Sequence, residues 1–250
     1  NVEISKETYK NKEELVNKAF QKAFDLLINR LLLEEDYKKI LSTNPAEIKK
    51  LISYYQIISQ NEKEENIKSE KFNVFFDKDR MHNFFYNKNI LYSDIINTEV
   101  ILFPLLKKDE EIFIYTKNYF YNNWNEEKLD NLIQYILPSE NIENIQKINS
   151  NKDNIHKIKV SDFFKEYEID NIVFANIEIN KNIAEVFLNT RIEKKKVNKN
   201  ISINKEKDMN QKEFYRQIVL TINNVIKDLI KSQNLIDVKT PSFLNVKIKL

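Results

Sequence analysis

The 250-residue chain contains no glycine, whereas an average composition would supply about 17. Glycine adopts positive φ angles at little cost, and it is needed where the backbone must approach a bound phosphate closely. Its absence therefore argues against a P-loop and against the dinucleotide-binding fingerprint. Asparagine tolerates a left-handed backbone best after glycine, so we expect it to occupy many turns, as in Asn87–Asn89 and Asn122–Asn123.

The rest of the composition indicates a globular chain with balanced charge. Lysine and arginine number 40 against 38 aspartates and glutamates, for a net charge of +2. This balance argues against a dedicated nucleic-acid binder, which usually carries a marked basic excess. There is no cysteine, which excludes disulfides and thiolate chemistry. Heavy use of Asn, Lys and Ile is typical of an AT-rich genome; codon bias thins glycine, and deliberate removal of glycine is the alternative explanation.

No run of about 18 apolar residues is present, so we expect no membrane span. No signal peptide is visible at Asn1, and we interpret the chain as a mature form whose leader has been removed.

Hydrophobic periodicity and breaker residues predict the elements of the chain. In the first part we expect strands at 1–9 and 72–76, helices at 11–31, at 44–55 behind an Asn44-Pro45 cap and at 80–90, and a charged loop at 60–71. In the second part we expect strands at 100–106, 112–115, 132–137, 171–179, 183–192, 196–203 and 243–250, and helices at 118–129, 141–148, 160–167 and 209–232. The segments 100–106 and 112–115 are predicted to form a hairpin, and 171–203 a meander.

Helices and hairpins that alternate in this way predict an α+β (mixed α/β) fold. We expect two small subdomains, each with helices packed on a mixed or antiparallel sheet. The first would cover residues 1–97 and the second, with the mixed sheet, residues 98–250.

Candidate catalytic residues are few. Asp77 and Asp79 lie two apart at the end of a predicted strand, where a pair of carboxylates can bind a divalent cation; the alternative is that one of them caps the helix that follows. His82 and His156 are the only histidines. Either could act as a general base, but neither belongs to a recognisable constellation with a serine, a cysteine or a second histidine, and ordinary structural placement is the alternative.

An aromatic cluster and a basic run are the remaining candidates for binding. Tyr115, Tyr119, Phe120, Tyr121 and Trp124 lie close together, and Trp124 is the only tryptophan. Such residues fill cores, anchor protein interfaces or stack on bases and sugars. We take Tyr119, Tyr121 and Trp124 as a possible partner surface, with sheet edges as the other candidate. The run 194–196 consists of three lysines and predicts a solvated hairpin tip, with phosphate contact as the alternative.

Several hydrophobic segments follow one another along most of the chain: Ala19–Leu31, Ile52–Tyr55, Phe72–Asp77, Ile101–Leu105, Tyr121–Trp124, and Phe163–Tyr167 with Ile172–Ala175. In this order they resemble the domain-of-unknown-function 2066 family, exported proteins of Gram-negative bacteria. The last unit is also similar to the amino-terminal domain of TolB-like periplasmic proteins. The resemblance implies an exported, periplasmic α/β scaffold with no established activity, no cofactor and no catalytic residues to carry over.

The chain departs from this family at two turns. The family favours glycine after the position of Tyr167 and near Asn89, where this chain has Glu168 and Asn89. A glutamate in a left-handed conformation would strain the backbone, so we expect altered loop geometry at Glu168.

Together these observations favour a non-enzymatic periplasmic scaffold, or a protein-interaction or assembly factor. We expect a protein partner of unknown identity and no nucleic acid, and neither a cofactor nor a small-molecule ligand is indicated. The alternatives are a metal-dependent or acid–base enzyme that uses Asp77 and Asp79 or a histidine, and a nucleic-acid-binding module that uses the lysines.

Overall fold

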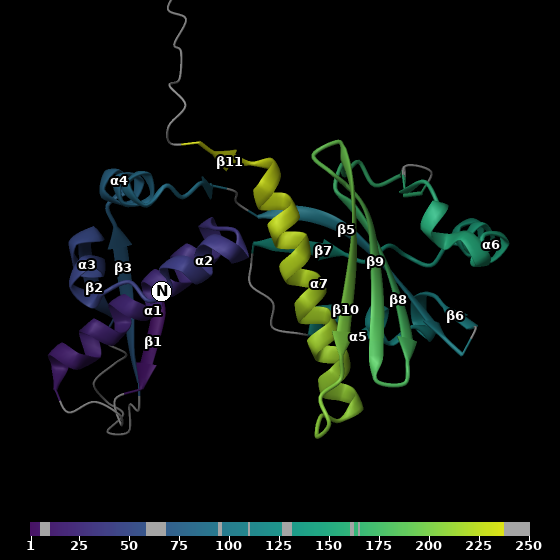
Figure 1. Ribbon diagram of the computed structural model, residues 1–250, viewed down its shortest axis with the longest axis horizontal. Coiled ribbons are helices and arrows are strands. Elements are labelled where there is room, and N and C mark those ends of the chain that lie inside the picture. The colour runs from purple at the N-terminus through teal and green to yellow at the C-terminus, as the bar shows by residue number, and fades with distance from the viewer. Residues whose placement is uncertain are drawn as a thin grey trace, which may run out of the picture. The chain divides into compact units, whose positions relative to one another are not determined.

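The structure is a computed structural model (Figure 1) that describes residues 1–5, 11–58, 69–94, 97–109, 111–126, 132–160, 163–164 and 166–237, with Asp153 and His156 described by their backbone alone. These residues divide into two compact units, 1–94 with 234–237, and 97–233. The sequence prediction placed residues 234–237 in the second subdomain, whereas they group with the first unit. Helices combined with an antiparallel sheet in one unit and a mixed sheet in the other confirm the α+β fold class. No helix within the described ranges is both long enough and apolar enough to cross a membrane.

The first unit consists of a small sheet with helices on one face. Its helices are α1 (Lys12–Leu31), α2 (Glu34–Ile40), α3 (Pro45–Leu51) and α4 (Lys78–Lys88), and its strands are β1 (Val2–Ser5), β2 (Ile52–Ile58), β3 (Ser69–Phe76), β4 (Tyr92–Ser93) and β11 (Leu235–Ile236). An antiparallel sheet has the order β1-β3-β2, and β11 pairs with β4. The buried side of α1, with Phe20, Phe24 and Ile28, contributes to the core beneath it.

Three helices of this unit begin with a side-chain cap, and the sequence predicts the caps at Asn44 and Asp77. The side chain of Asn11 accepts a hydrogen bond from the Glu14 amide at 2.8 Å, and Asn44 accepts one from the Ala46 amide at 2.8 Å. Asp77 accepts one from the Arg80 amide at 3.0 Å. Each cap provides a partner for one of the backbone amides that the first turn of a helix leaves unpaired.

The helix predicted over 44–55 is wrong in its second half. It ends at Leu51, and Ile52 begins β2, which pairs with β3 through Ile58. The sequence from Ile52 to Ile58 is rich in β-branched and aromatic residues, which suit a strand, and pairing with β3 decides between the two structures. Most of the predicted loop at 60–71 lies outside the described residues, but β3 already begins at Ser69.

The second unit is built on a mixed sheet. Its elements are β5 (Thr98–Lys108), β6 (Glu111–Phe113), η1 (Tyr115–Lys117), α5 (Tyr119–Asn123), η2 (Trp124–Glu126), β7 (Ile133–Ile136), α6 (Ile142–Ser150), η3 (Lys152–Lys157), β8 (Ile172–Asn180), β9 (Ile183–Ile192), β10 (Lys195–Asn204) and α7 (Gln211–Gln233). The strand order is β10-β9-β8-β5-β6, with β7 beside the first half of β5. The β5–β6 hairpin and the β8–β9–β10 meander confirm the prediction.

The two faces of this sheet are covered differently. The long helix α7 lies along the meander and buries Phe214, Ile218 and Ile222 against one face (Figure 1). On the other face, α6 and η3 pack over β5 and the beginning of β8, where Phe103 and Phe174 are buried. The later part of β8, with β9 and β10, carries polar and half-exposed side chains on that second face. This face is therefore only partly covered within the unit.

Three other sequence predictions for the second unit need correction or fall outside the structure. The described residues of 160–167 form no α-helix, and Phe164 has a φ of 54°, which a right-handed helix does not allow. Asn122 and Asn123 lie in the short helix α5 rather than in a turn. The strand predicted at 243–250 lies outside the described residues.

Left-handed backbone occurs at residues other than glycine. Among the described residues, eight have positive φ: Asn89, Asn97, Asp109, Tyr115, Phe164, Lys181, Glu193 and Lys194. Asparagine therefore serves at two of these positions, including the C-cap of α4 at Asn89, and other residue types at the remaining six. Glu168 is not among them, so the strain expected there is absent. Tyr115 and Phe164 both pack on Phe103, with ring centroids 5.1 Å apart in each pair, and this packing helps to hold their unfavourable backbone.

Candidate functional site

The predicted aromatic surface is largely part of the core. Trp124 is fully buried against the sheet, so it presents no surface to a partner, and the core alternative describes it correctly. Tyr119 is half-buried, with its ring 4.7 Å from that of Tyr215. The half-buried Tyr121 donates a hydrogen bond to the Pro138 carbonyl at 2.8 Å, and burial raises the pKa of its phenol.

The two predicted metal ligands act differently in the structure. Asp77 caps α4, and its second carboxylate oxygen lies 3.7 Å from Nε of Arg80. Asp79 lies in the first turn of α4, where a carboxylate interacts favourably with the helix dipole. No group of three or more metal-ligating His, Cys, Asp or Glu side chains occurs in the described part of the chain. These positions support the capping alternative.

His82 contacts an aromatic residue of the same unit. Its Nδ1 lies 3.3 Å from the hydroxyl of Tyr92, and the two rings meet edge to face. Burial raises the pKa of Tyr92, and Asp94 adds to the shift. The contact joins α4 to β4, which is a structural arrangement. The side chain of His156, the other predicted base, lies outside what the structure describes.

The three lysines lie at the tip of the β9–β10 hairpin, as predicted. Glu193 and Lys194 form the two-residue connection, both with positive φ. Lys194 is 82% exposed, with its Nζ 3.9 Å from a carboxylate oxygen of Asp170. Lys195 and Lys196 begin β10 and are exposed.

The first unit has an exposed aromatic surface that is not among the sites predicted from the sequence. Tyr54 and Phe75 stack on adjacent strands with ring centroids 4.2 Å apart and planes 13° apart. They are 52% and 38% exposed. Gln56 and Ile58 follow Tyr54 on the same face by strand alternation. We call these four residues the β2 surface.

The β2 surface adjoins an edge strand that carries no charged side chain. Among the described residues, β2 pairs with β3 alone. Its seven residues, Ile52–Ile58, include no charge and no proline. An edge strand presents unpaired backbone donors and acceptors, and proteins usually protect such edges with bulges or lysines. The pairing of β2 with β3 shifts register between Ile52 and Tyr54, but β2 has no lysine. The edge strand β10 of the second unit shows that protection, because Lys195, Lys196 and Lys199 lie along it.

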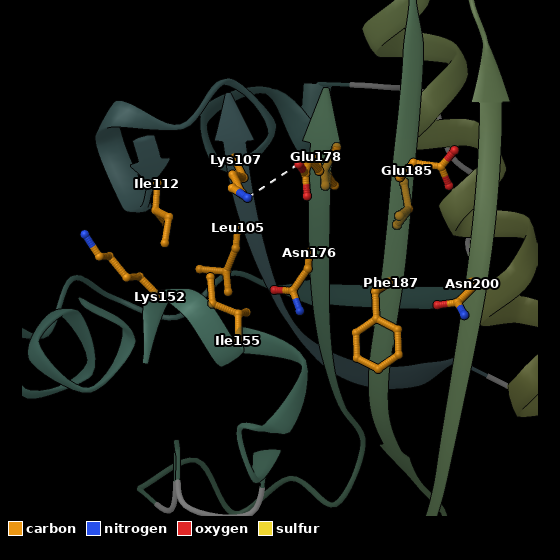
Figure 2. Close-up of a pocket in the computed structure, with 12 residues that line it drawn as sticks. Leu105, Lys107, Ile112, Lys152, Ile155, Asn176, Glu178, Glu185, Phe187 and Asn200 are labelled. Carbon is orange, nitrogen blue, oxygen red and sulfur yellow. Dashed lines mark hydrogen bonds and ion pairs between the residues drawn. The ribbon is translucent and has the colours of Figure 1, made fainter. Parts of the chain in front are cut away.

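A cleft lies on the partly covered face of the second unit (Figure 2), with a volume of about 250 Å³. Its floor is built from rows of residues that pair across the strands. One row is Leu105, Asn176, Phe187 and Asn200, from β5, β8, β9 and β10 in that order. The next row is Lys107, Glu178, Glu185 and Ser202. Side chains of β6 and η3, including Ile112 and Ile155, form one wall.

The second row of the floor places two carboxylates on directly opposed residues. Glu178 and Glu185 are paired across β8 and β9, and like charges in such positions repel. Each has a compensating neighbour: Nζ of Lys107 lies 3.4 Å from Glu178, and the Ser202 hydroxyl donates to Glu185 at 2.7 Å. These partners provide local stabilisation for both carboxylates.

A signal for the cleft is present in the sequence of β8. This strand is apolar from Ile172 to Ala175 and then carries Asn176, Glu178 and Asn180 at alternate positions. The alternation marks a change from a covered to an open face, but the pairing that brings Phe187 and Asn200 beside it appears only in the folded sheet.

No family model matches the chain, and searches of curated proteins and of solved structures find no match either.

Proposed function

We propose that the protein is a non-enzymatic interaction or assembly factor that binds an extended segment of a partner protein through β2. The observation that carries this proposal is an uncharged edge strand bordered by the exposed pair Tyr54 and Phe75. The sheet edges were one of the two binding surfaces expected from sequence, and this edge differs from β10 in having no charge to repel an added strand.

Strand addition would use both the open backbone of β2 and the exposed side chains beside it. A partner segment aligned with β2 would pair its backbone with the outer donors and acceptors of the strand. Alternate side chains of that segment would lie beside Tyr54, Gln56 and Ile58 on the exposed face. Tyrosine is enriched where interfaces concentrate their binding energy. The partner segment that fits is therefore uncharged, with β-branched residues at alternate positions.

The compartment and the wider role rest on the resemblance to the exported family. On that basis we propose a periplasmic location and a scaffolding role. The enzyme alternative has little support in the residues named for it, because Asp77 caps a helix and His82 contacts Tyr92. The nucleic-acid alternative would require a basic surface, and the lysines at the hairpin tip adjoin Glu193 and approach Asp170.

The test is binding of a labelled seven-residue peptide that alternates threonine and valine, measured by fluorescence anisotropy with the full chain. Gln56→Lys places a charge in the middle of the exposed edge, and we expect it to weaken binding by about tenfold or more. Asn198→Lys, on the lysine-rich edge strand β10, is the matched control and should leave the affinity unchanged. A peptide N-methylated at alternate residues should not bind, because it lacks the backbone donors.

Two results would contradict the proposal. One is an affinity that Gln56→Lys reduces no more than Asn198→Lys does. The other is sedimentation showing that the chain forms a dimer that Gln56→Lys dissociates, because the edge would then be occupied by a second copy of this chain.

A further inference from the structure

We propose that the cleft of the second unit binds a neutral carbohydrate, one saturated sugar ring that lies against Phe187. This inference does not depend on the proposed role of β2, because it concerns a different unit and different residues. Four properties of the cleft carry it: its charge balance, an unpaired acceptor, an aromatic ring between two amides, and its size.

The charges of the described side chains that line the cleft cancel. Lys107 and Lys152 contribute two positive charges, and Glu178 and Glu185 two negative ones. Lys107 and Glu178 already interact with each other, at 3.4 Å. A ligand with a net charge would therefore meet no net charge of the opposite sign in the cleft. This favours an uncharged ligand over a phosphate, a carboxylate or an amine.

Asn176 provides an acceptor with an unmet requirement. Its Oδ1 is buried and has no hydrogen-bond partner among the described residues. Buried polar atoms are nearly always paired, so a ligand that donates a hydrogen bond would favour a rotation of the Asn176 amide that turns this acceptor into the cleft. Figure 2 shows the Asn176 side chain in the cleft, between the strand that carries Leu105 and the strand that carries Phe187. A hydroxyl group of a sugar is such a donor.

Phe187 lies between two amides at the same level of the sheet. It pairs with Asn176 on one side and Asn200 on the other. Amides donate and accept hydrogen bonds, which matches hydroxyl groups that do the same. The ring between them offers an apolar face. A sugar ring matches both the amides and the apolar ring, because its edge carries hydroxyls and one of its faces carries C–H groups.

The size of the cleft limits the ligand. Its volume of about 250 Å³ lies just below the range of roughly 300–1,000 Å³ typical of sites for drug-sized molecules. One sugar ring is consistent with this space. A nucleobase could also stack on Phe187, but a nucleotide would bring a phosphate to a cleft whose described lining has no positive excess.

The test is titration of the full chain by saturation-transfer NMR and calorimetry. The neutral probes are methyl glucoside and N-acetylglucosamine, and the comparison probes are glucuronate, glucosamine, adenosine and inorganic phosphate. We expect a neutral sugar to bind with a Kd of about 1–10 mM or tighter. We expect each of the four comparison probes to bind at least about tenfold more weakly.

Asn176→Leu is the decisive variant, because it removes the unpaired acceptor at similar size. We expect it to reduce sugar affinity by about tenfold or more while the melting temperature is unchanged or higher. Asn198→Leu, one row further along β10 and outside the lining, is the matched control and should bind like the parent chain. Gln56→Lys should also leave sugar binding unchanged, so that failure of the β2 proposal and failure of this one are separate results.

The proposal is overturned if neither neutral sugar binds by about 10 mM. It is also overturned if adenosine or a charged probe binds as tightly as the neutral sugars, or if Asn176→Leu retains the parent affinity. If Asn176→Leu were poorly folded, Asn200→Leu on the exposed strand β10 would replace it. We expect the same loss of sugar affinity from this variant, and retention of the parent affinity would overturn the proposal.

Discussion

At the scale of single residues, Asp77 separates a structural role from a catalytic one. Its side chain caps α4 through the Arg80 amide at 3.0 Å. Asp77→Ala should lower the free energy of unfolding by about 1 kcal/mol, because it removes the cap, whereas Asp77→Asn should retain nearly all of the stability. Chemical denaturation followed by circular dichroism measures both variants.

Divalent cations provide the contrary test at the same residue. We expect Mg²⁺ and Ca²⁺ to leave the melting temperature of the parent chain unchanged, and likewise that of Asp77→Asn. A cation-dependent rise in melting temperature that Asp77→Asn abolishes would restore the metal-site alternative.

At the scale of elements, the β9–β10 hairpin shows what the lack of glycine means for stability. Glu193 and Lys194 both have positive φ in a two-residue connection, the conformation for which an asparagine followed by a glycine is preferred. The double variant Glu193→Asn with Lys194→Gly supplies that pair. We expect it to raise the free energy of unfolding of the second unit by about 1 kcal/mol.

Trp124 fluorescence during denaturation measures this change, because the tryptophan is buried in the same unit. Lys199→Gly, within β10, is the matched control and should destabilise the unit instead, since glycine weakens the interior of a strand. If the double variant lowers stability as the control does, the positive φ angles of Glu193 and Lys194 do not destabilise the turn.

The sequence predicts elements better than it predicts sites, and the reasons are physical. Caps such as Asn44 and Asp77 act over two or three residues, so their effect is visible locally. The segment 44–55 has apolar residues at helical spacing, at Ile48, Leu51, Ile52 and Tyr55, yet pairing with β3 makes its second half a strand. Local spacing alone could not reveal that pairing.

The candidate sites depend on contacts between distant parts of the chain. The cleft places Leu105 beside Asn176, and Phe187 beside Asn200, and only the register of the sheet brings these residues together. Trp124 was one of three residues predicted as a partner surface, and it is fully buried. The residue type alone does not distinguish a core position from an interface position, because both favour large aromatic side chains.

At the scale of the whole molecule, each unit has its own core, so we expect the two units to unfold separately. The only tryptophan lies in the second unit, and its fluorescence reports that unit alone. Phe24→Ala, in the fully buried centre of the first core, should cost that unit about 3–5 kcal/mol. Circular dichroism should then show an earlier transition, while the fluorescence transition stays where it is in the parent chain.

A fluorescence transition that moves together with the circular dichroism transition in Phe24→Ala would show one cooperative molecule instead. Phe120→Ala, in the core around Trp124, is the reciprocal variant and should move the fluorescence transition.

The pairing of β11 with β4 has a consequence for biosynthesis. A ribosome would synthesise every residue of the sheet from β5 to β10, and then α7, before it reached Leu235. The inserted unit could thus complete its structure during translation, while the surrounding one waits for a strand made later. Nascent chains that end at Gln233, followed by a linker long enough to carry α7 out of the ribosome, should therefore resist proteolysis in the inserted unit although β4 has no partner.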